Sequence, residues 1–133
     1  MKAISANASR ALNIGSLVLA SDNSGARIVR IVSVKKGKVS KKTQQYAKIA
    51  DMVKVSVRKG KPEMKGEVFD AIVIRVKKPY KRKTGERVMF EDNAVVLLKD
   101  NKGNPKGTQI KGAVAKESVE RWQAVGKIAQ FVL

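Results

Sequence analysis

The chain has 133 residues, of which 43% are apolar and 5% aromatic, and 29 lysines and arginines stand against 11 aspartates and glutamates, a formal net charge of +18. That length predicts one domain, residues 1–133, and the charge predicts a polyanionic partner, foremost nucleic acid. Cysteine and histidine are both absent, which excludes disulfides, thiol chemistry and the commonest general base and metal ligand, so no cofactor and no metal are expected.

The amino-terminal residues give no targeting signal. Ser5, Asn7, Ser9 and Arg10 interrupt the apolar residues there, so no signal-peptide core is predicted. The chain also lacks an apolar run of about 18 residues, the length that a membrane-spanning helix needs. We therefore expect a cytoplasmic protein with no membrane partner, and an anionic membrane surface is a minor alternative for so basic a chain.

Short apolar runs bounded by turn residues predict a mainly β fold. Strict alternation over 53–58 places three valines on a core face and Lys54, Ser56 and Arg58 on the other. The run at 68–76 is apolar on both faces in its middle, which predicts a central strand covered on both sides. Five or six such strands favour a closed barrel, over about residues 15–114. The runs are Leu17–Ala20, Arg27–Val34, Met52–Arg58, Val68–Val76, Arg87–Phe90 and Ala94–Leu98, with Ile110–Val114 a weaker candidate.

Only the last part of the chain, about residues 115–133, has a helical pattern. Its apolar residues recur near helical spacing, and Glu117 and Arg121 form a correctly oriented i,i+4 pair. Gly126 is expected to weaken or divide the helix. The apolar positions are Val119, Trp122, Val125, Ile128, Ala129 and Val132.

Three basic clusters lie at residues 27–42, 58–62 and 77–83, and residues 1–83 hold 21 basic and 5 acidic side chains, against 8 and 6 in 84–133. Cations at this density neutralise phosphates and release counterions, which predicts RNA binding. The alternative, a merely solvated charged face, is less favoured because the whole chain is so basic. The candidate RNA-binding residues are Arg27, Arg30, Lys35, Lys36, Lys38, Lys41, Lys42, Arg58, Lys59, Lys61, Lys77, Lys78, Tyr80, Lys81, Arg82 and Lys83.

Tyr80 is the one aromatic residue of the third cluster, with five basic residues around it. A tyrosine in such surroundings can stack on an unpaired base, an interaction worth about 1–3 kcal/mol. Pro79 and Tyr80 could equally form a turn with the ring packed on the barrel. The sequence leaves both interpretations open.

The carboxy-terminal residues 113–133 are nearly balanced in charge, which suits a protein partner better than phosphate. Trp122, Ile128, Phe131 and Leu133 are the candidate contact residues, because one short helix cannot cover all its apolar side chains. The alternative is that Trp122 and Phe131 cap the open end of the barrel.

No group of residues predicts catalysis. Glu91 and Asp92 are adjacent, and neighbouring residues on a strand point to opposite faces, so they make a poor acid–base pair. Neither a Walker-type phosphate loop nor a GxGxxG motif is present. The sequence therefore predicts no catalytic residues and no enzyme.

The chain carries, in order, Ala71–Ile74, nine residues, Thr84-Gly85 and Phe90–Leu97, together with Ala20–Ala26, Val57–Glu63 and Lys111–Glu117. These motifs resemble the family of the universal ribosomal protein number fourteen of the large subunit, from about Gly15 to Leu133. Two residues depart from the family. Thr84, which precedes Gly85, stands where the family usually has Asp, Asn or Ser, and Ala50 stands where it usually has Gly. The basic stretch at 59–63, the Tyr80 cluster and the tail bearing Trp122 look like the archaeal and eukaryotic branch.

The resemblance implies a small five-stranded β-barrel with a short helical carboxy-terminal segment, acting as a structural protein of the cytoplasmic ribosome. It implies binding to large-subunit ribosomal RNA near the subunit interface and a bridge to small-subunit RNA. Neighbouring large-subunit ribosomal proteins and an anti-association factor are further expected partners. The alternative is a free-standing binder of single-stranded nucleic acid, which should carry several exposed aromatic residues.

Overall fold

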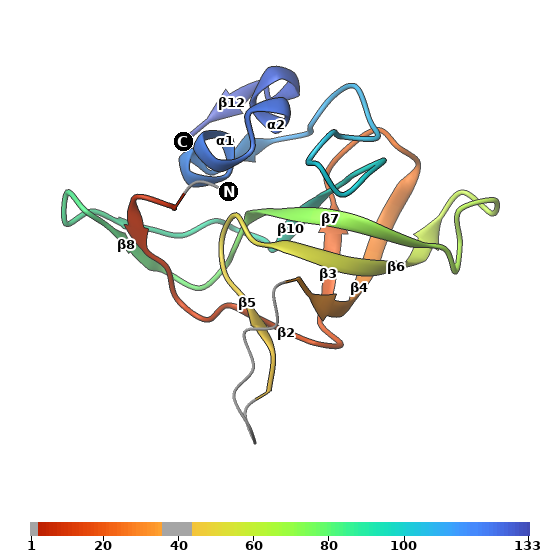
Figure 1. Cartoon of the computed structure of the whole chain (residues 1–133), viewed down its shortest axis with the longest axis horizontal. Coiled ribbons are helices and arrows are strands. Elements are labelled where there is room, and N and C mark those ends of the chain that lie inside the picture. Colours follow the sequence, from red (N-terminus) through yellow and green to blue (C-terminus); the bar gives the residue numbers. More distant parts are fainter. Residues whose placement is uncertain (1–2, 36–43) are drawn as a thin grey trace.

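The computed structural model describes residues 3–35 and 44–133, and at its centre lies a closed barrel of five strands (Figure 1). Their order around the barrel is β10-β3-β4-β6-β7, and every neighbouring pair is antiparallel except β10 and β3, which close the barrel as a parallel pair. The predicted mainly β fold with a closed barrel is confirmed. The strands are β3 (Leu17–Ala20), β4 (Ala26–Val34), β6 (Met52–Gly60), β7 (Val68–Arg75) and β10 (Ala94–Leu97).

The barrel interior is filled by inward-facing residues, which alternate with outward-facing residues along each strand. On β6, Val53, Val55 and Val57 are buried while Lys54 and Arg58 are exposed, as the alternation predicts. These valines belong to one core cluster with the inward residues of β3, β4 and β10. A core of branched aliphatic side chains fits a chain with so few aromatic residues.

Strand β7 is covered on both faces, which confirms the prediction for residues 68–76. It lies between β6 and β10, and Ala71–Arg75 are all buried. Ala71 and Val73 point into the barrel core, whereas Ile72 and Ile74 belong to a second cluster on its outer face, together with Ile110, Val114 and Val125.

Two short helices cover that outer face: α1 (Lys116–Arg121) and α2 (Gln123–Ile128), which lie together on one side of the barrel (Figure 1). The break falls at Trp122, with φ −125° and ψ 86°, and not at Gly126. A Cβ at Gly126 would lie 2.7 Å from Val119 Cγ1, so this glycine allows the helices to pack closely instead of dividing them.

The helical prediction is wrong for the last residues. Phe131–Val132 form β12, which pairs in parallel with β11 (Ala113–Val114). The Leu133 amide donates to the Val114 carbonyl and the Lys116 amide donates to the Leu133 carbonyl, both at 3.0 Å. These main-chain bonds between distant residues outweigh the local helical periodicity.

Two more small sheets flank the barrel. The first consists of β1 (Ala6–Asn7), β8 (Tyr80–Arg82) and β9 (Arg87–Val88), and the second pairs β2 (Leu12–Asn13) with β5 (Tyr46–Ala47). The run predicted at 87–90 is therefore a strand only in its first half, and it lies outside the barrel. The amino-terminal segment thus braces the third basic cluster.

Ala50 has a left-handed backbone, with φ +67°, and no other non-glycine residue in the described ranges has a positive φ. The family usually has glycine at this position, and the structure gives the reason, because a left-handed conformation costs an L-residue about 1–2 kcal/mol. The surroundings hold it in place: the Ala50 amide donates to the Val73 carbonyl, and the Ala50 carbonyl accepts from Trp122 Nε1 at 2.8 Å.

Candidate nucleic-acid interface

The first two basic clusters meet on neighbouring strands. Arg27 and Arg30 lie on β4, Arg58 and Lys59 lie on β6, and the register places Ile28 of β4 opposite Lys59. All four cations are exposed, and Lys61 follows them in the turn after β6. The sheet therefore joins two clusters that lie about 30 residues apart in the sequence into one basic surface.

The third cluster lies elsewhere. The turn that follows β6 and the hairpin that contains β8 project at opposite ends of the molecule (Figure 1). In this cluster Lys77, Lys78, Lys81 and Lys83 are exposed. The cations that the structure describes thus lie along the length of the molecule and are not gathered into one patch.

Tyr80 does not belong to the accessible surface, so the prediction that it stacks on a base is corrected. Its residue exposure is 3%, its ring belongs to the barrel core, and its hydroxyl donates a 2.7 Å hydrogen bond to Glu117 Oε2. Burial, followed by the neighbouring Glu117 carboxylate, raises the pKa of the Tyr80 phenol well above its ordinary value. The alternative of a turn with the ring packed on the barrel is the one that the structure supports.

Arg82 is also engaged inside the fold. Its Nε donates to Glu117 Oε1 at 2.8 Å, and its Nη2 donates to the Leu133 carbonyl. Burial alone would lower the pKa of the guanidinium, but the hydrogen bonds to Glu117 and Tyr80 raise it. Glu117 therefore pairs with Tyr80 and Arg82 and not with Arg121 as predicted, and Arg121 Nη1 lies 3.3 Å from Asp51.

Lys35 is half-buried and its Nζ lies 3.1 Å from Asp70 Oδ1, so this lysine is partly neutralised within the chain. Lys36, Lys38, Lys41 and Lys42 lie outside the described residues, and their predicted RNA contacts are neither supported nor contradicted by the structure. The exposed candidates with no acidic partner in the described part of the chain are Arg27, Arg30, Arg58, Lys59, Lys61, Lys77, Lys78, Lys81 and Lys83.

The candidate protein-contact residues separate into two pairs. Trp122 and Ile128 pack against the second core cluster, and Trp122 Nε1 is tied to the Ala50 carbonyl. Phe131 and Leu133 are 65% and 61% exposed. Trp122 therefore serves the fold on the outer face of the barrel and does not cap its open end as the alternative held. Phe131 does not cap the barrel either, and the end of β12 presents the accessible apolar side chains.

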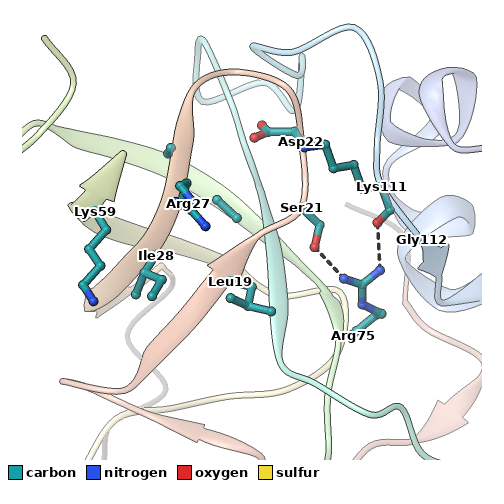
Figure 2. Close-up of a pocket in the computed structure, with 11 residues that line it drawn as sticks. Leu19, Ser21, Asp22, Arg27, Ile28, Lys59, Arg75, Lys111 and Gly112 are labelled. Carbon is teal, nitrogen blue, oxygen red and sulfur yellow. Dashed lines mark hydrogen bonds between the residues drawn. The ribbon is translucent and has the colours of Figure 1, made fainter. Parts of the chain in front are cut away.

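Arg75 was missed by the sequence prediction. This arginine ends β7, is 8% exposed, and donates to Asp92 Oδ1 at 2.8 Å and to the Lys111 and Ala113 carbonyls at 3.0 and 2.9 Å. Figure 2 shows its guanidinium between Ser21 and Lys111. An arginine directly after the apolar residues 71–74 of a doubly covered strand was the signal that could have identified it.

Tyr46 lies among cations, which the sequence prediction also missed. Arg10 Cζ is 4.5 Å from the centroid of its ring, and Lys48 Nζ is 5.7 Å away. Such contacts attract a cation to the ring face. No local motif links Arg10 to Tyr46, because the pairing of β2 with β5 brings them together.

The described residues contain no group of three or more acidic, histidine or cysteine side chains placed to hold a metal ion. None of the helices in the same ranges is long and apolar enough to cross a membrane. Asp92 serves the Arg75 ion pair, 2.8 Å from its Nε, while Glu91 is exposed. The geometry thus offers basic and apolar surfaces for binding.

Comparison with known protein sequences identifies related proteins. The family model described as ribosomal protein L14p/L23e matches residues 11–133. A protein from Nanoarchaeum equitans named large ribosomal subunit protein uL14 is 51% identical over 133 residues, which is the full length of both chains. Proteins of the same name from Methanothrix thermoacetophila and Methanocorpusculum labreanum are 49% and 44% identical, again over the full length of both chains. The chain therefore belongs to the ribosomal protein L14p/L23e family, with archaeal relatives.

Proposed function

We propose that this chain is a structural, non-catalytic protein of the large ribosomal subunit in the cytoplasm, and that it acts as a single domain that binds large-subunit ribosomal RNA. The names of its relatives support the subunit. The observation that carries the RNA contact is the set of nine exposed cations that have no acidic partner within residues 3–35 and 44–133, because each is available to neutralise a phosphate.

The exposed lysines of the β8 hairpin are the foremost contacts in this proposal. Lys81 and Lys83 flank Arg82, whose guanidinium is fixed by Glu117, so the hairpin holds its lysines on a braced strand. Binding through phosphates is favoured over stacking on single strands, because Phe131 alone of the six aromatic side chains, all in the described ranges, is exposed, while Tyr80 and Phe90 are buried. This disfavours a free-standing binder of single-stranded nucleic acid.

The finer placement follows from the resemblance and is part of the proposal. The protein lies near the subunit interface and contributes to a bridge to small-subunit RNA. The exposed Phe131 and Leu133 serve a neighbouring large-subunit ribosomal protein or an anti-association factor, because exposed apolar side chains grouped at one place are typical of protein contacts.

The test compares two triple variants of equal charge change. Lys77, Lys81 and Lys83 are replaced by Gln in one, and Lys99, Lys102 and Lys106 in the other; all six are exposed. If the hairpin lysines neutralise phosphates, the first variant reduces the slope of log affinity against log salt by about 2–3, at roughly 0.7–0.9 per phosphate. The second leaves it nearly unchanged. Equal losses in the two variants would contradict the proposed hairpin contact.

A further inference from the structure

An apolar stripe lies on the outer face of β3 and β4. Leu17 is 62% exposed and Leu19 is 42% exposed, whereas Val18 between them is buried in the barrel. The register places Leu19 opposite Ile28 and Leu17 opposite Arg30. We call Leu17, Leu19 and Ile28 the β3–β4 stripe.

Three hollows surround this stripe, with volumes of about 580, 240 and 480 Å³. Ile28 lines all three, and each of the two leucines lines two of them. Figure 2 shows Lys59, Arg27 and Ile28 on one side of Leu19, with Arg75 and Lys111 on the other. The surface is therefore an apolar ridge with concave flanks, which gives a partner room to seat side chains on both sides.

The rim of the hollows is strongly basic. Two of its three carboxylates are already used, because Asp22 accepts from the Leu97 amide and the Ser24 hydroxyl and Asp92 pairs with Arg75. Glu91 is the exposed one. The exposed cations of the rim are Arg27, Arg30, Arg58, Lys59, Lys77 and Lys111. An occupant must therefore carry negative charge around apolar groups.

RNA meets only half of that requirement. Phosphates would satisfy the rim, but nucleobases bind exposed protein surface chiefly by stacking on aromatic rings. None of the residues that line the three hollows is aromatic. A ribose–phosphate backbone over Leu17 and Leu19 would remove water from them without offering an apolar partner. Aliphatic side chains flanked by carboxylates satisfy both the ridge and its rim.

We propose that the β3–β4 stripe is a docking site for another protein, whose segment carries aliphatic side chains flanked by aspartate or glutamate. The aliphatic groups cover Leu17, Leu19 and Ile28, and the carboxylates pair with rim cations such as Arg30 and Lys59. This refines the proposed function, on which it rests: the rim cations of β4 and β6 contact protein, and the lysines of the β8 hairpin contact RNA.

The test uses the full chain and three labelled probes at physiological salt: a short peptide of alternating leucine and glutamate, a matched peptide of serine and glutamate, and oligouridine. The leucine peptide should bind at least about tenfold more tightly than the serine peptide, because covering exposed leucine side chains gains affinity. It should also shift the methyl resonances of Leu17, Leu19 and Ile28, a measurement that needs no variant. Equal affinity for the two peptides, or methyl shifts elsewhere, overturns the proposal.

Two variants separate this site from the RNA contact. Leu17→Ser with Leu19→Ser should remove the preference for the leucine peptide and leave oligouridine affinity within about twofold. The control Val68→Ser, which changes an exposed apolar side chain of β7 outside the stripe, should alter neither. Lys81→Gln with Lys83→Gln should weaken oligouridine binding alone. If the leucine substitutions weaken oligouridine as much as the peptide, the stripe is an RNA surface and the proposal fails. If Lys81→Gln with Lys83→Gln leaves oligouridine affinity unchanged while the peptide preference remains intact, only the proposed RNA contact of the hairpin is refuted.

Discussion

The hydrogen-bonded group of Tyr80, Arg82 and Glu117 decides between two roles for the third basic cluster. If Tyr80 serves the fold, Tyr80→Phe should lower the free energy of unfolding while leaving RNA affinity unchanged. The lost bond is short, at 2.7 Å, and joins a hydroxyl to the carboxylate of a residue that is 2% exposed. Hydrogen bonds to charged groups are worth about 1.5–3 kcal/mol, and we expect a loss of about that size.

Glu117→Gln should cost more, because Arg82 then keeps its charge without a carboxylate. Breaking a buried ion pair costs about 3–5 kcal/mol, and we lower this to about 2–4 kcal/mol because the Arg82 side chain is 16% exposed. The double variant with Tyr80→Phe should lose less than the sum of the two single losses, by about 1–2 kcal/mol, since Glu117→Gln already weakens the hydrogen bond that Tyr80→Phe removes.

Urea unfolding followed by the fluorescence of Trp122, the sole tryptophan, measures these free energies. The RNA half of the test uses Tyr80→Leu, because phenylalanine would keep an aromatic ring. Under conditions where it is folded, this variant should bind a large-subunit RNA fragment within about twofold of the original chain. A loss of tenfold or more, which is the scale of base stacking, or strict additivity of the stability losses would refute the reasoning.

Three further outcomes follow from the structure. Ala50→Gly should leave stability unchanged or raise it by up to about 1 kcal/mol, because relief of the left-handed strain exceeds the added freedom of the unfolded chain; a loss in urea unfolding would contradict this. Arg75→Met should cost about 3 kcal/mol in the same assay, near the lower end for a broken ion pair because Asp92 is about a third exposed. In a Tyr46→Phe chain, whose sole tyrosine is Tyr80, the phenolate absorbance should appear only well above pH 10, since the folded chain favours the neutral phenol. The contribution of the raised Tyr80 pKa to the free energy of unfolding is complete below pH 10 and is lost as pH rises through the folded pKa.

The barrel could be predicted because its evidence is local. Inward and outward positions alternate along a strand, so Val53, Val55 and Val57 reveal their face without any knowledge of the partner strands. Residues 71–75 reveal two covered faces in the same way. The helical periodicity of the last residues was equally local, but it was wrong for Phe131–Val132, because pairing with β11, some 18 residues away, determines their conformation.

The site was harder to predict because its decisive contacts are distant in sequence. Glu117 lies 37 residues from Tyr80 and 35 from Arg82, while the five basic residues around Tyr80 favoured RNA and Pro79 left a packed turn open. Alternation on β8 nevertheless separates the cluster: Tyr80 and Arg82 face Glu117 while Lys81 is exposed. Applying the two-residue period to the charged segments, and not only to the apolar ones, would have divided RNA candidates from residues that serve the fold.

The distribution of the acidic residues strengthens the basic surface beyond what the net charge suggests. Of the 11 acids, Asp22, Asp51 and Glu117 are buried, and only Glu63, Glu67, Glu86 and Glu91 are exposed; 19 lysines and arginines in the described ranges are exposed. The fold thus uses carboxylates internally to bind backbone amides and a few cations, and leaves the other cations to repel one another. Repulsion of this kind destabilises the compact free chain. A polyanion that binds only the folded form removes this repulsion, so binding to RNA stabilises the folded protein in addition to fixing its position.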